Sequence, residues 1–228
     1  MMPWPPDLSA RKIVPELLDS ASPAEIATNL RDLQRINRYF GGRQTLRSVL
    51  RPLQRPGLTI LDVGAASADH AASLPNARVV SLDRSEAHLH HGHGARVAAD
   101  AFALPFAPRS FDLVMANLFL HHFENDAIVS LLQSFAAVAR LGVVINDLER
   151  SRLAWSFLPL TAPLLRWSPI TLHDGPVSVA AGFRPTELAE FFRSAGLHGA
   201  VVRRHRPWFR LSAVWLAQRP LPHIDETK

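Results

Sequence analysis

One stretch of the chain joins a strand-like apolar run, a carboxylate and a turn of small residues. Residues 59–69 read TILDVGAASAD, in which Asp62 stands two positions before Gly64. A strand that runs into a tight small-residue turn and then into a helix brings backbone N–H groups and the positive helix start close to a ligand. We therefore expect a cofactor to bind at Gly64, Ala65 and Ala66.

Further polar residues stand at the ends of the strands that we expect next, where the ligands of open parallel sheets bind. Asp83 comes about twenty residues after the turn, at a place where a carboxylate can accept hydrogen bonds from both hydroxyls of a ribose. Arg84 follows it directly, Asp100 ends the third expected strand, and Asn117 ends the fourth. We expect all four residues to contribute to one binding site.

Four side chains are candidates for a general base, because they stand at strand ends or in the segment before the last expected helix. They are His121, His122, Asp147 and His173. A positioned base typically accelerates proton transfer from an oxygen nucleophile about a hundredfold to ten-thousandfold. The sequence leaves open which of the four acts.

A run of histidines at residues 88–93 (HLHHGH) raises the question of a metal site. Closely spaced imidazoles can share an ion, but metal sites usually add a carboxylate, and Glu86 is the nearest one in the sequence. A solvated loop is the simpler interpretation of the run. We predict no metal.

The spacing of apolar residues changes along the chain from helical to strand-like. Residues 24–40 have helical spacing behind a Ser22-Pro23 start, and residues 44–53 predict a second helix. The expected strands are residues 58–63, 78–83, 95–99, 111–117, 142–147, 200–206 and 209–217. Later helices are expected over residues 125–140 and 186–195, the second ending at Gly196.

Apolar strands that alternate with helices are typical of a parallel sheet covered on both faces. We expect one α/β, Rossmann-like, doubly wound domain. Its expected parts are N-terminal helices over 1–57, a cofactor-binding half over 58–149, a helical cap over 150–183, and a final helix and strands over 184–217. Side chains of the cap could form a core, an apolar acceptor pocket or a patch for peripheral contact with a membrane. They are Trp155, Phe157, Leu160, Leu164, Leu165 and Trp167.

The composition narrows the classes of protein further. The 228 residues carry a net charge of +5, almost all of it arginine, because only Lys12 and Lys228 are lysines. Arginine favours planar anions, but apart from residues 203–206 the arginines are scattered, so we do not expect nucleic-acid binding. The chain has no cysteine, no signal-like start and no apolar run long enough to cross a bilayer. We expect a cytoplasmic protein.

Taken in order, these motifs resemble the class I S-adenosylmethionine-dependent methyltransferases with a type 11 methyltransferase domain. The usual first motif of that family reads apolar-Asp-apolar-Gly-x-Gly-x-Gly. This chain keeps Asp62 and Gly64 but carries Ala66 and Ala68 at the other glycine positions. The resemblance implies S-adenosylmethionine as the cofactor and a seven-stranded, mostly parallel sheet whose last strand is antiparallel.

The resemblance also implies roles for later residues. The family's acid at the position of Asp100 accepts from the adenine amino group, and the residues that follow it, here Ala101 and Phe102, line the adenine ring. Residues 117–122 (NLFLHH) resemble the loop beneath the methionine part of the donor, beside the substrate. Leu118 would therefore belong to the donor site together with Asn117.

Residues 146–150 (NDLER) and 184–187 (RPTE) are similar to the branch related to quinone and polyketide methyltransferases. This resemblance implies methyl transfer to oxygen or carbon of a small apolar aromatic, quinone-like or polyketide acceptor in secondary metabolism. Because the donor's methyl group is already activated, such an enzyme mainly has to align the acceptor behind it. The partner would be a small molecule, and no pattern predicts an oligomeric state.

Ala66 and Ala68 leave an alternative open. If the turn requires a positive φ, alanine costs about 1–2 kcal/mol there, and its methyl group can crowd the ligand. A turn with negative φ accepts alanine without strain. The alternative is a non-catalytic methyltransferase-fold protein with a binding or regulatory role, and a nicotinamide oxidoreductase is a more remote third.

Overall fold

The computed structural model describes residues 7–66, 74, 76–90 and 94–217. Its centre is a seven-stranded sheet in the order β3-β2-β1-β4-β5-β7-β6. The strands are β1 (Leu58–Val63), β2 (Ala77–Asp83), β3 (Ala95–Ala98), β4 (Phe111–Asn117), β5 (Ala139–Leu148), β6 (Val201–His205) and β7 (Arg210–Leu216).

Strands β1 to β5 are parallel, whereas β7 runs antiparallel to both of its neighbours, β5 and β6. The strand order reverses at β1, because the chain places β2 and β3 on one side of it and β4 and β5 on the other. Open α/β sheets bind ligands at such a switch point, outside the carboxyl ends of the strands. The predicted fold class is confirmed, including the antiparallel last strand.

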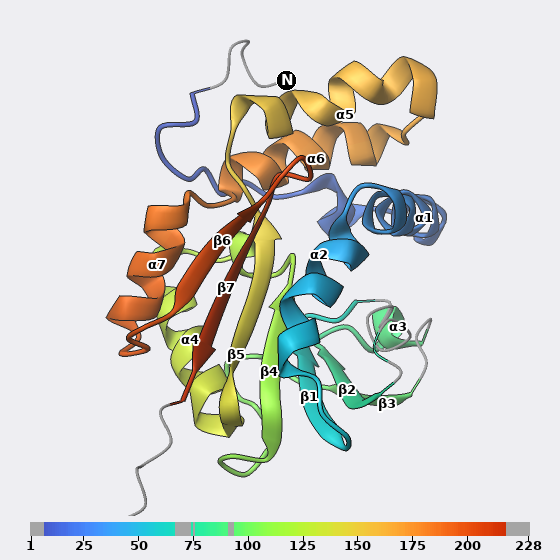
Figure 1. Ribbon diagram of the computed structural model, residues 1–228. Coiled ribbons are helices and arrows are strands. Elements are labelled where there is room, and N and C mark those ends of the chain that lie inside the picture. The colour runs from blue at the N-terminus through green and yellow to red at the C-terminus, as the bar shows by residue number, and fades with distance from the viewer. Residues whose placement is uncertain (1–6, 67–73, 75, 91–93, 218–228) are drawn as a thin grey trace, which may run out of the picture.

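The helices are α1 (Pro23–Tyr39), α2 (Gly42–Leu50), α3 (Glu86–Leu89), α4 (Asn125–Val138), α5 (Arg152–Leu165), α6 (Pro169–Ala181) and α7 (Pro185–Ser194). Short 3-10 turns are η1 (Leu17–Ser20), η2 (Arg51–Leu53) and η4 (Leu120–His122). In Figure 1, α4 and α7 lie on one face of the sheet and α2 on the other. Helices α5 and α6 lie above the carboxyl end of β5, as a cap.

The two faces of the sheet have separate apolar cores. In β1, Leu61 and Val63 belong to the core beneath α4 and α7, whereas Leu58 and Ile60 belong to the core beneath α2. Because successive side chains of a strand point to opposite faces, one continuous apolar run fills both cores. This packing holds the start of the turn at Gly64 in place.

Most predicted helices have bounds close to those expected from the sequence. The helix expected over residues 44–53 ends as an α-helix at Leu50 and continues as a 3-10 turn, because Pro52 lacks the N–H that an α-helix needs. The last helix ends before Gly196, which has a φ of 78°. A glycine in the left-handed conformation is a common helix terminator, as predicted here.

The cap consists of two helices, although the sequence there has an irregular pattern. Pro159 and Pro163 lie inside α5 and Pro176 lies inside α6, and such prolines remove backbone hydrogen bonds and interrupt helical periodicity. No helix in the described ranges is long and apolar enough to cross a membrane.

The sequence leaves three interpretations for the side chains of the cap: a core, an acceptor pocket and a patch for membrane contact. Trp155 and Trp167 are buried in the core of the cap, and Phe157 lines a cavity. Leu160 and Leu164 are 75% and 82% exposed. Core and pocket therefore both apply, to different residues, and contact with a membrane surface stays a prediction.

Residues 7–16 have no regular secondary structure and lead along α6 toward η1. The carboxylate of Asp174 in α6 accepts from the backbone N–H groups of Leu17 and Leu18 at 2.9 and 3.0 Å. The helices expected within residues 1–57 thus begin only at residue 17, and residues 1–6 lie outside the described part. The contacts with α6 bring Glu16 over the carboxyl ends of the strands.

Candidate functional site

A cavity of about 730 Å³ lies between the carboxyl ends of the strands and the cap. Its walls come from the turn after β1, the ends of β2 and β4, the start of β7, and α1, α5 and α6. The sequence-predicted residues that line it are Gly64, Ala65, Ala66, Asp83, Asn117, Leu118, His121 and His122. The predicted residues outside its lining are Asp62, Arg84, Asp100, Ala101, Phe102, Asp147 and His173.

The turn after β1 is tied to the end of β2 by backbone hydrogen bonds. The N–H groups of Gly64 and Ala65 both donate to the carbonyl of Leu82, at 2.8 and 3.0 Å. The N–H of Ala66 donates to Asp83 Oδ2 at 2.9 Å. This arrangement brings the turn and the carboxylate together, as the sequence predicts, while Ala68 lies outside the described residues.

Two residues of the turn have left-handed backbone, with φ values of 70° at Gly64 and 44° at Ala66. A side chain at Gly64 would be strained, and its Cβ would lie 2.1 Å from a ring carbon of Phe119. Ala66 is an alanine in a conformation that favours glycine, at a cost of about 1–2 kcal/mol. The dihedral that the sequence left open is thus positive.

Replacing Ala66 with glycine should stabilise the protein by about 0.5–1 kcal/mol. The strain of an alanine in the left-handed conformation is removed, and this gain exceeds the entropy cost of the more flexible glycine. Thermal unfolding followed by circular dichroism should show a melting temperature about 1–4 °C higher. Ala65→Gly is the matched control, since Ala65 is not among the residues with positive φ. It should lower the melting temperature, and a decrease in both variants would contradict the strain at Ala66.

Asp83 ends β2 with both of its carboxylate oxygens anchored. Oδ2 accepts from Ala66 and Oδ1 accepts from the N–H of Ser85, each at 2.9 Å. Burial alone raises the pKa of Asp83, but its interactions with His88 and the two N–H groups outweigh burial and hold the pKa below its ordinary value. Each carboxylate oxygen has two lone pairs, so each can accept one more hydrogen bond from a hydroxyl in the cavity.

His88 lines the same cavity, although the sequence predicts a solvated loop there. Its Nδ1 lies 3.8 Å from Asp83 Oδ1, and this interaction raises the pKa of His88 above its ordinary value against the effect of burial. The short helix α3 turns the chain back toward Asp83 and so places the imidazole of His88 near that carboxylate. Residues 91–93 of the histidine run lie outside the described part.

Asp100, Ala101 and Phe102 lie beside the cavity rather than in its lining. The exposed Asp100 accepts from the N–H of Phe102 at 2.9 Å. The ring of Phe102 contacts Phe123, which in turn contacts Phe119 of the cavity wall, with ring centroids 5.5 and 4.8 Å apart. A row of rings thus joins this loop to the cavity, and recognition of adenine here stays a prediction.

The end of β4 turns sharply into the cavity. Asn117 Oδ1 accepts from the side-chain amide of Asn146 at 2.6 Å, which links the ends of β4 and β5. Leu118 follows with a φ of 53°, and its N–H donates to the carbonyl of Asn146 at 2.8 Å. Strained residues that the surrounding structure holds in place cluster at functional sites.

A buried hydrogen-bonded pair joins His121 to Asp147. Nδ1 of His121 lies 2.7 Å from Asp147 Oδ1, and the two side chains are 4% and 0% exposed. Backbone N–H groups of Leu120 and Leu148 also donate to this carboxylate, at 3.0 and 2.8 Å. Burial alone raises the pKa of Asp147, but the interactions with His121 outweigh burial and hold the pKa below its ordinary value. The pair therefore contains an ionised carboxylate at neutral pH.

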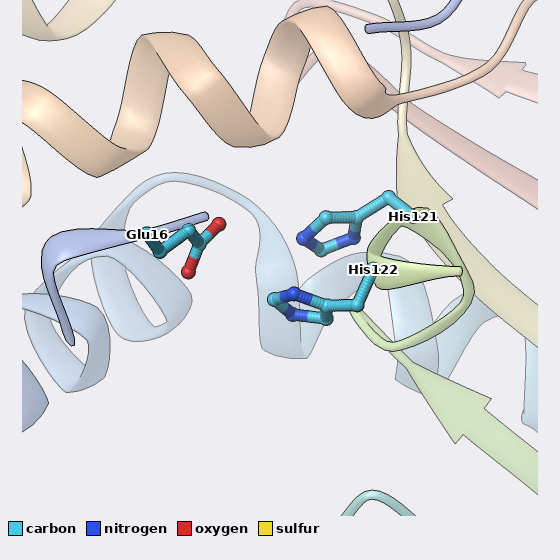
Figure 2. Close-up of side chains that lie close together, drawn as sticks. All are labelled: Glu16, His121 and His122. Atoms are coloured by element: carbon cyan, nitrogen blue, oxygen red, sulfur yellow. The ribbon is translucent and has the colours of Figure 1, made fainter. Parts of the chain in front are cut away.

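His122 and Glu16 complete this part of the cavity. Figure 2 shows the carboxylate of Glu16 facing the imidazole rings of His121 and His122. The two rings have centroids 4.2 Å apart and planes tilted by 34°. Although part of His122 is exposed to solvent, desolvation by the surrounding protein and the neighbouring His121 lower its pKa to about 3, so its imidazole is neutral at pH 7. Glu16 accepts a hydrogen bond from the hydroxyl of Ser178 in α6. It reaches the site from a segment in which no sequence motif marks it.

The same three side chains are those that could hold a metal ion within the described residues. One ligand atom from each lies within 4.8 Å of the others. Two ligand atoms that share a zinc ion at about 2.1 Å each are at most about 4.2 Å apart. A limit of 4.8 Å admits an ion as well as separate side chains, but Asp147 already orients His121 by its hydrogen bond. We therefore favour proton transfer at this cluster.

His173 is not brought into this cluster. Its Nδ1 lies 2.8 Å from Asp174 Oδ1, and its side chain is 43% exposed. Asp174 lines the cavity and His173 does not. Of the four candidates for a base, His121, His122 and Asp147 are brought together, and we leave His173 out of the mechanism.

Comparisons with known proteins agree with this geometry. Residues 61–145 match the family model described as a methyltransferase domain. The demethylmenaquinone methyltransferase of Roseiflexus sp. (strain RS-1) is 27% identical over 166 residues, which cover 63% of this chain and 69% of that protein.

Solved structures are similar in fold. The plantazolicin methyltransferase BpumL, solved in complex with SAH, has a TM-score of 0.65 at 14% identity, with 89% of this chain and 93% of that chain covered. The magnesium protoporphyrin IX methyltransferase (ChlM) from Synechocystis PCC 6803, solved with bound SAH, has a TM-score of 0.56 at 16% identity, covering 78% and 84%.

The matched domain runs from β1 to β5 and so contains the turn, Asp83, the end of β4 and His121. At their low identity the solved structures establish the fold, while the family match and the curated relative concern the activity. Residues 61–145 thus match a methyltransferase domain, and the fold around them is shared with solved methyltransferases; together these findings support an S-adenosylmethionine-dependent methyltransferase.

Proposed function

We propose that this methyltransferase acts on a hydroxylated, largely apolar small molecule of aromatic, quinol-like or polyketide type. One observation carries the proposal: the buried pair of Asp147 and His121 adjoins the cavity that also contains the turn at Gly64 and the carboxylate of Asp83. Donor-binding and proton-accepting groups therefore meet in one space.

The residues of the turn fit S-adenosylmethionine. Asp83 keeps lone pairs that can accept from both ribose hydroxyls, while Asn117 and Leu118 line the wall where the methionine part would lie. When bound, the donor supplies a methyl group that is already activated on a sulfonium. What the chain has to contribute is mainly alignment, which can supply on the order of 7–11 kcal/mol of the barrier.

His121 is the group that we propose as the proton acceptor. Asp147 holds Nδ1, so the other ring nitrogen, which faces the cavity, is free to take a proton from a hydroxyl of the acceptor (Figure 2). The buried carboxylate then stabilises the imidazolium that forms, as in other carboxylate–histidine pairs. An ionised phenol or enol is nucleophilic at oxygen and, through its ring or double bond, at carbon. The same pair can therefore serve either kind of methylation.

The walls of the cavity support an apolar acceptor. Leu30 and Leu33 of α1, Phe40 at the end of that helix, and Phe157 and Leu158 of α5 line it, and the rings of Phe40 and Phe157 are in contact with centroids 4.9 Å apart. Aromatic rings and branched side chains with a few polar groups among them are typical of small-molecule sites. The curated relative is named for methylation of demethylmenaquinone, which also supports a quinol-like acceptor.

The experiment that tests the proposal follows label from methyl-tritiated S-adenosylmethionine into an organic extract. The acceptors to offer are 1-naphthol, 1-hydroxy-2-naphthoate and chemically reduced menadione, with aniline and benzamide as acceptors without a hydroxyl. We expect label in hydroxylated acceptors and none in the amine or the amide. Binding of the donor without transfer to any hydroxylated acceptor would count against the proposal.

Metal removal should leave this activity unchanged, because the proposed proton acceptor is oriented by Asp147 and not by an ion. Dialysis against EDTA followed by the same assay in metal-free buffer is the measurement. A loss of activity that zinc or manganese restores would mean that Glu16, His121 and His122 bind an ion instead.

A further inference from the structure

Arg210 is a buried cation on the cavity wall. It is the first residue of β7, pairs in register with Leu148 of β5, and is only 6% exposed. Its Nε is buried without a hydrogen-bond partner among the described residues. Within that part of the chain, its guanidinium donates no hydrogen bond. A charged group therefore lines the cavity without a direct partner.

The other buried arginine among the described residues is fully engaged. Arg150 donates to the carbonyls of Leu8 and Gly182, at 3.2 and 2.6 Å, and to the carboxylate of Glu187 at 2.5 Å. It joins the N-terminal segment, the cap and α7, which is a structural role. Arg210 lacks such links.

Burying an arginine without a partner is costly, since each buried ion loses several kcal/mol of hydration. The negative charge that acts on Arg210 is that of Asp147, but this carboxylate is already engaged by the His121 ring and three backbone N–H groups. Burial lowers the pKa of Arg210 to about 10, so the guanidinium is still charged at neutral pH. The site thus holds a positive charge and fork-shaped donors for a group that enters the cavity.

The position of Arg210 in the sheet separates it from the donor turn. Strand β7 is three places from β1 in the sheet, with β4 and β5 between them, and neighbouring strands are about 4.8 Å apart. Arg210 is therefore roughly 14 Å from the turn across the sheet. The pair of His121 and Asp147 lies at the ends of the intervening strands, which places Arg210 in the acceptor part of the cavity.

We propose that Arg210 binds an anionic oxygen of the acceptor, either a carboxylate beside the reacting hydroxyl or the ionised hydroxyl itself. This inference rests on the proposed function and narrows its acceptor. A guanidinium presents two parallel N–H donors that match a carboxylate, and it also stabilises a phenolate. It would select acidic acceptors and orient them toward His121.

The first test needs no acceptor and uses thermal unfolding of the full chain. Arg210→Met should raise the melting temperature by a few degrees, because it replaces an unpaired buried charge with an apolar side chain of similar length. Arg150→Met is the matched control and should lower it, since the carbonyl of Gly182 and Glu187 Oε1 lose their donor and the carbonyl of Leu8 keeps only Arg184. A decrease for Arg210→Met would assign the residue a structural role and overturn the proposal.

The second test measures binding by calorimetry to protein saturated with S-adenosylhomocysteine. The probes are 1-hydroxy-2-naphthoate, 2-naphthoate and 1-naphthol, the last at pH 7 and at pH 9.5, where more of its hydroxyl is ionised. The wild type should bind an anionic probe at least tenfold more tightly than neutral 1-naphthol. Arg210→Gln should lose this preference, Arg210→Lys should keep part of it, and the exposed Arg203→Gln should behave as the wild type.

The probes also identify the source of the anionic oxygen. A preference for both naphthoates indicates a carboxylate, whereas a preference for 1-naphthol at the higher pH indicates the ionised hydroxyl. Affinity for S-adenosylhomocysteine should be the same in all variants, and its loss in Arg210→Gln would assign the residue to the donor's carboxylate instead. No preference in the wild type, or no binding of any probe, would overturn the proposal, while the labelled-transfer assay judges the proposed function separately.

Discussion

Replacing Asp83 with asparagine should lower the affinity for S-adenosylmethionine and S-adenosylhomocysteine about a hundredfold or more. Two hydrogen bonds from ribose hydroxyls to a carboxylate are each worth about 1.5–3 kcal/mol, and each 1.4 kcal/mol is a factor of ten in affinity. An amide also loses one of the two acceptors that hold the N–H groups of Ala66 and Ser85. Isothermal titration calorimetry measures the change.

The matched control for Asp83→Asn is Asp126→Asn, an exposed acid in the first turn of α4, which should bind the donor as the wild type does. Because the pKa of Asp83 lies below its ordinary value, its carboxylate is ionised throughout the range above about pH 5. Wild-type affinity should therefore not fall with the protonation of Asp83 in that range. Normal binding by Asp83→Asn would show that the ribose lies elsewhere.

Replacing His121 with asparagine should lower kcat about a hundredfold to ten-thousandfold with little change in donor affinity. The variant lacks the nitrogen that accepts the acceptor's proton, and general bases typically contribute that much. Asp147→Asn should have an effect of similar size, because an asparagine amide favours the wrong tautomer of the imidazole and cannot stabilise its charge. Steady-state methyl transfer with saturating donor separates kcat from binding.

Replacing His173 with asparagine distinguishes among the candidate bases that the sequence does not rank. His173 is exposed, contacts Asp174 and does not line the cavity, so His173→Asn should keep kcat within about twofold. Unfolding temperatures of all three variants control for loss of structure, since His121 and Asp147 are buried. A large loss at His173 with normal rates at His121 would reverse the assignment.

Local patterns suffice for the sheet and for the turn after β1. β1 and β4 have the bounds predicted from their apolar runs, because those runs end at a glycine turn and at a polar residue. The register of the parallel strands then brings Asp83 and Asn117 to the same edge as Gly64. The sequence cannot supply the φ of Ala66, because alanine is compatible with either sign until the turn is tied to Leu82 and Asp83.

Residues that reach the site through distant contacts have no local signal. Glu16 stands 162 positions from Ser178, whose hydroxyl holds it. Arg210 becomes informative only when its burial and its lack of a partner are known, because a lone arginine before a strand is ordinary. His121 and Asp147 are 26 positions apart in the sequence, and they meet because β4 and β5 are neighbours in the sheet. The two helices of the cap are hard to predict for a local reason, because their prolines interrupt the helical spacing of apolar residues.

The central claim is that donor and acceptor meet in the cavity between the strand ends and the cap. A crystal structure of the protein with S-adenosylhomocysteine tests it most directly. We predict the ribose hydroxyls within hydrogen-bond distance of Asp83, and the sulfur directed toward the part of the cavity that contains His121 and Arg210. A ligand bound outside this cavity, or inside it with the ribose away from Asp83, would contradict the account.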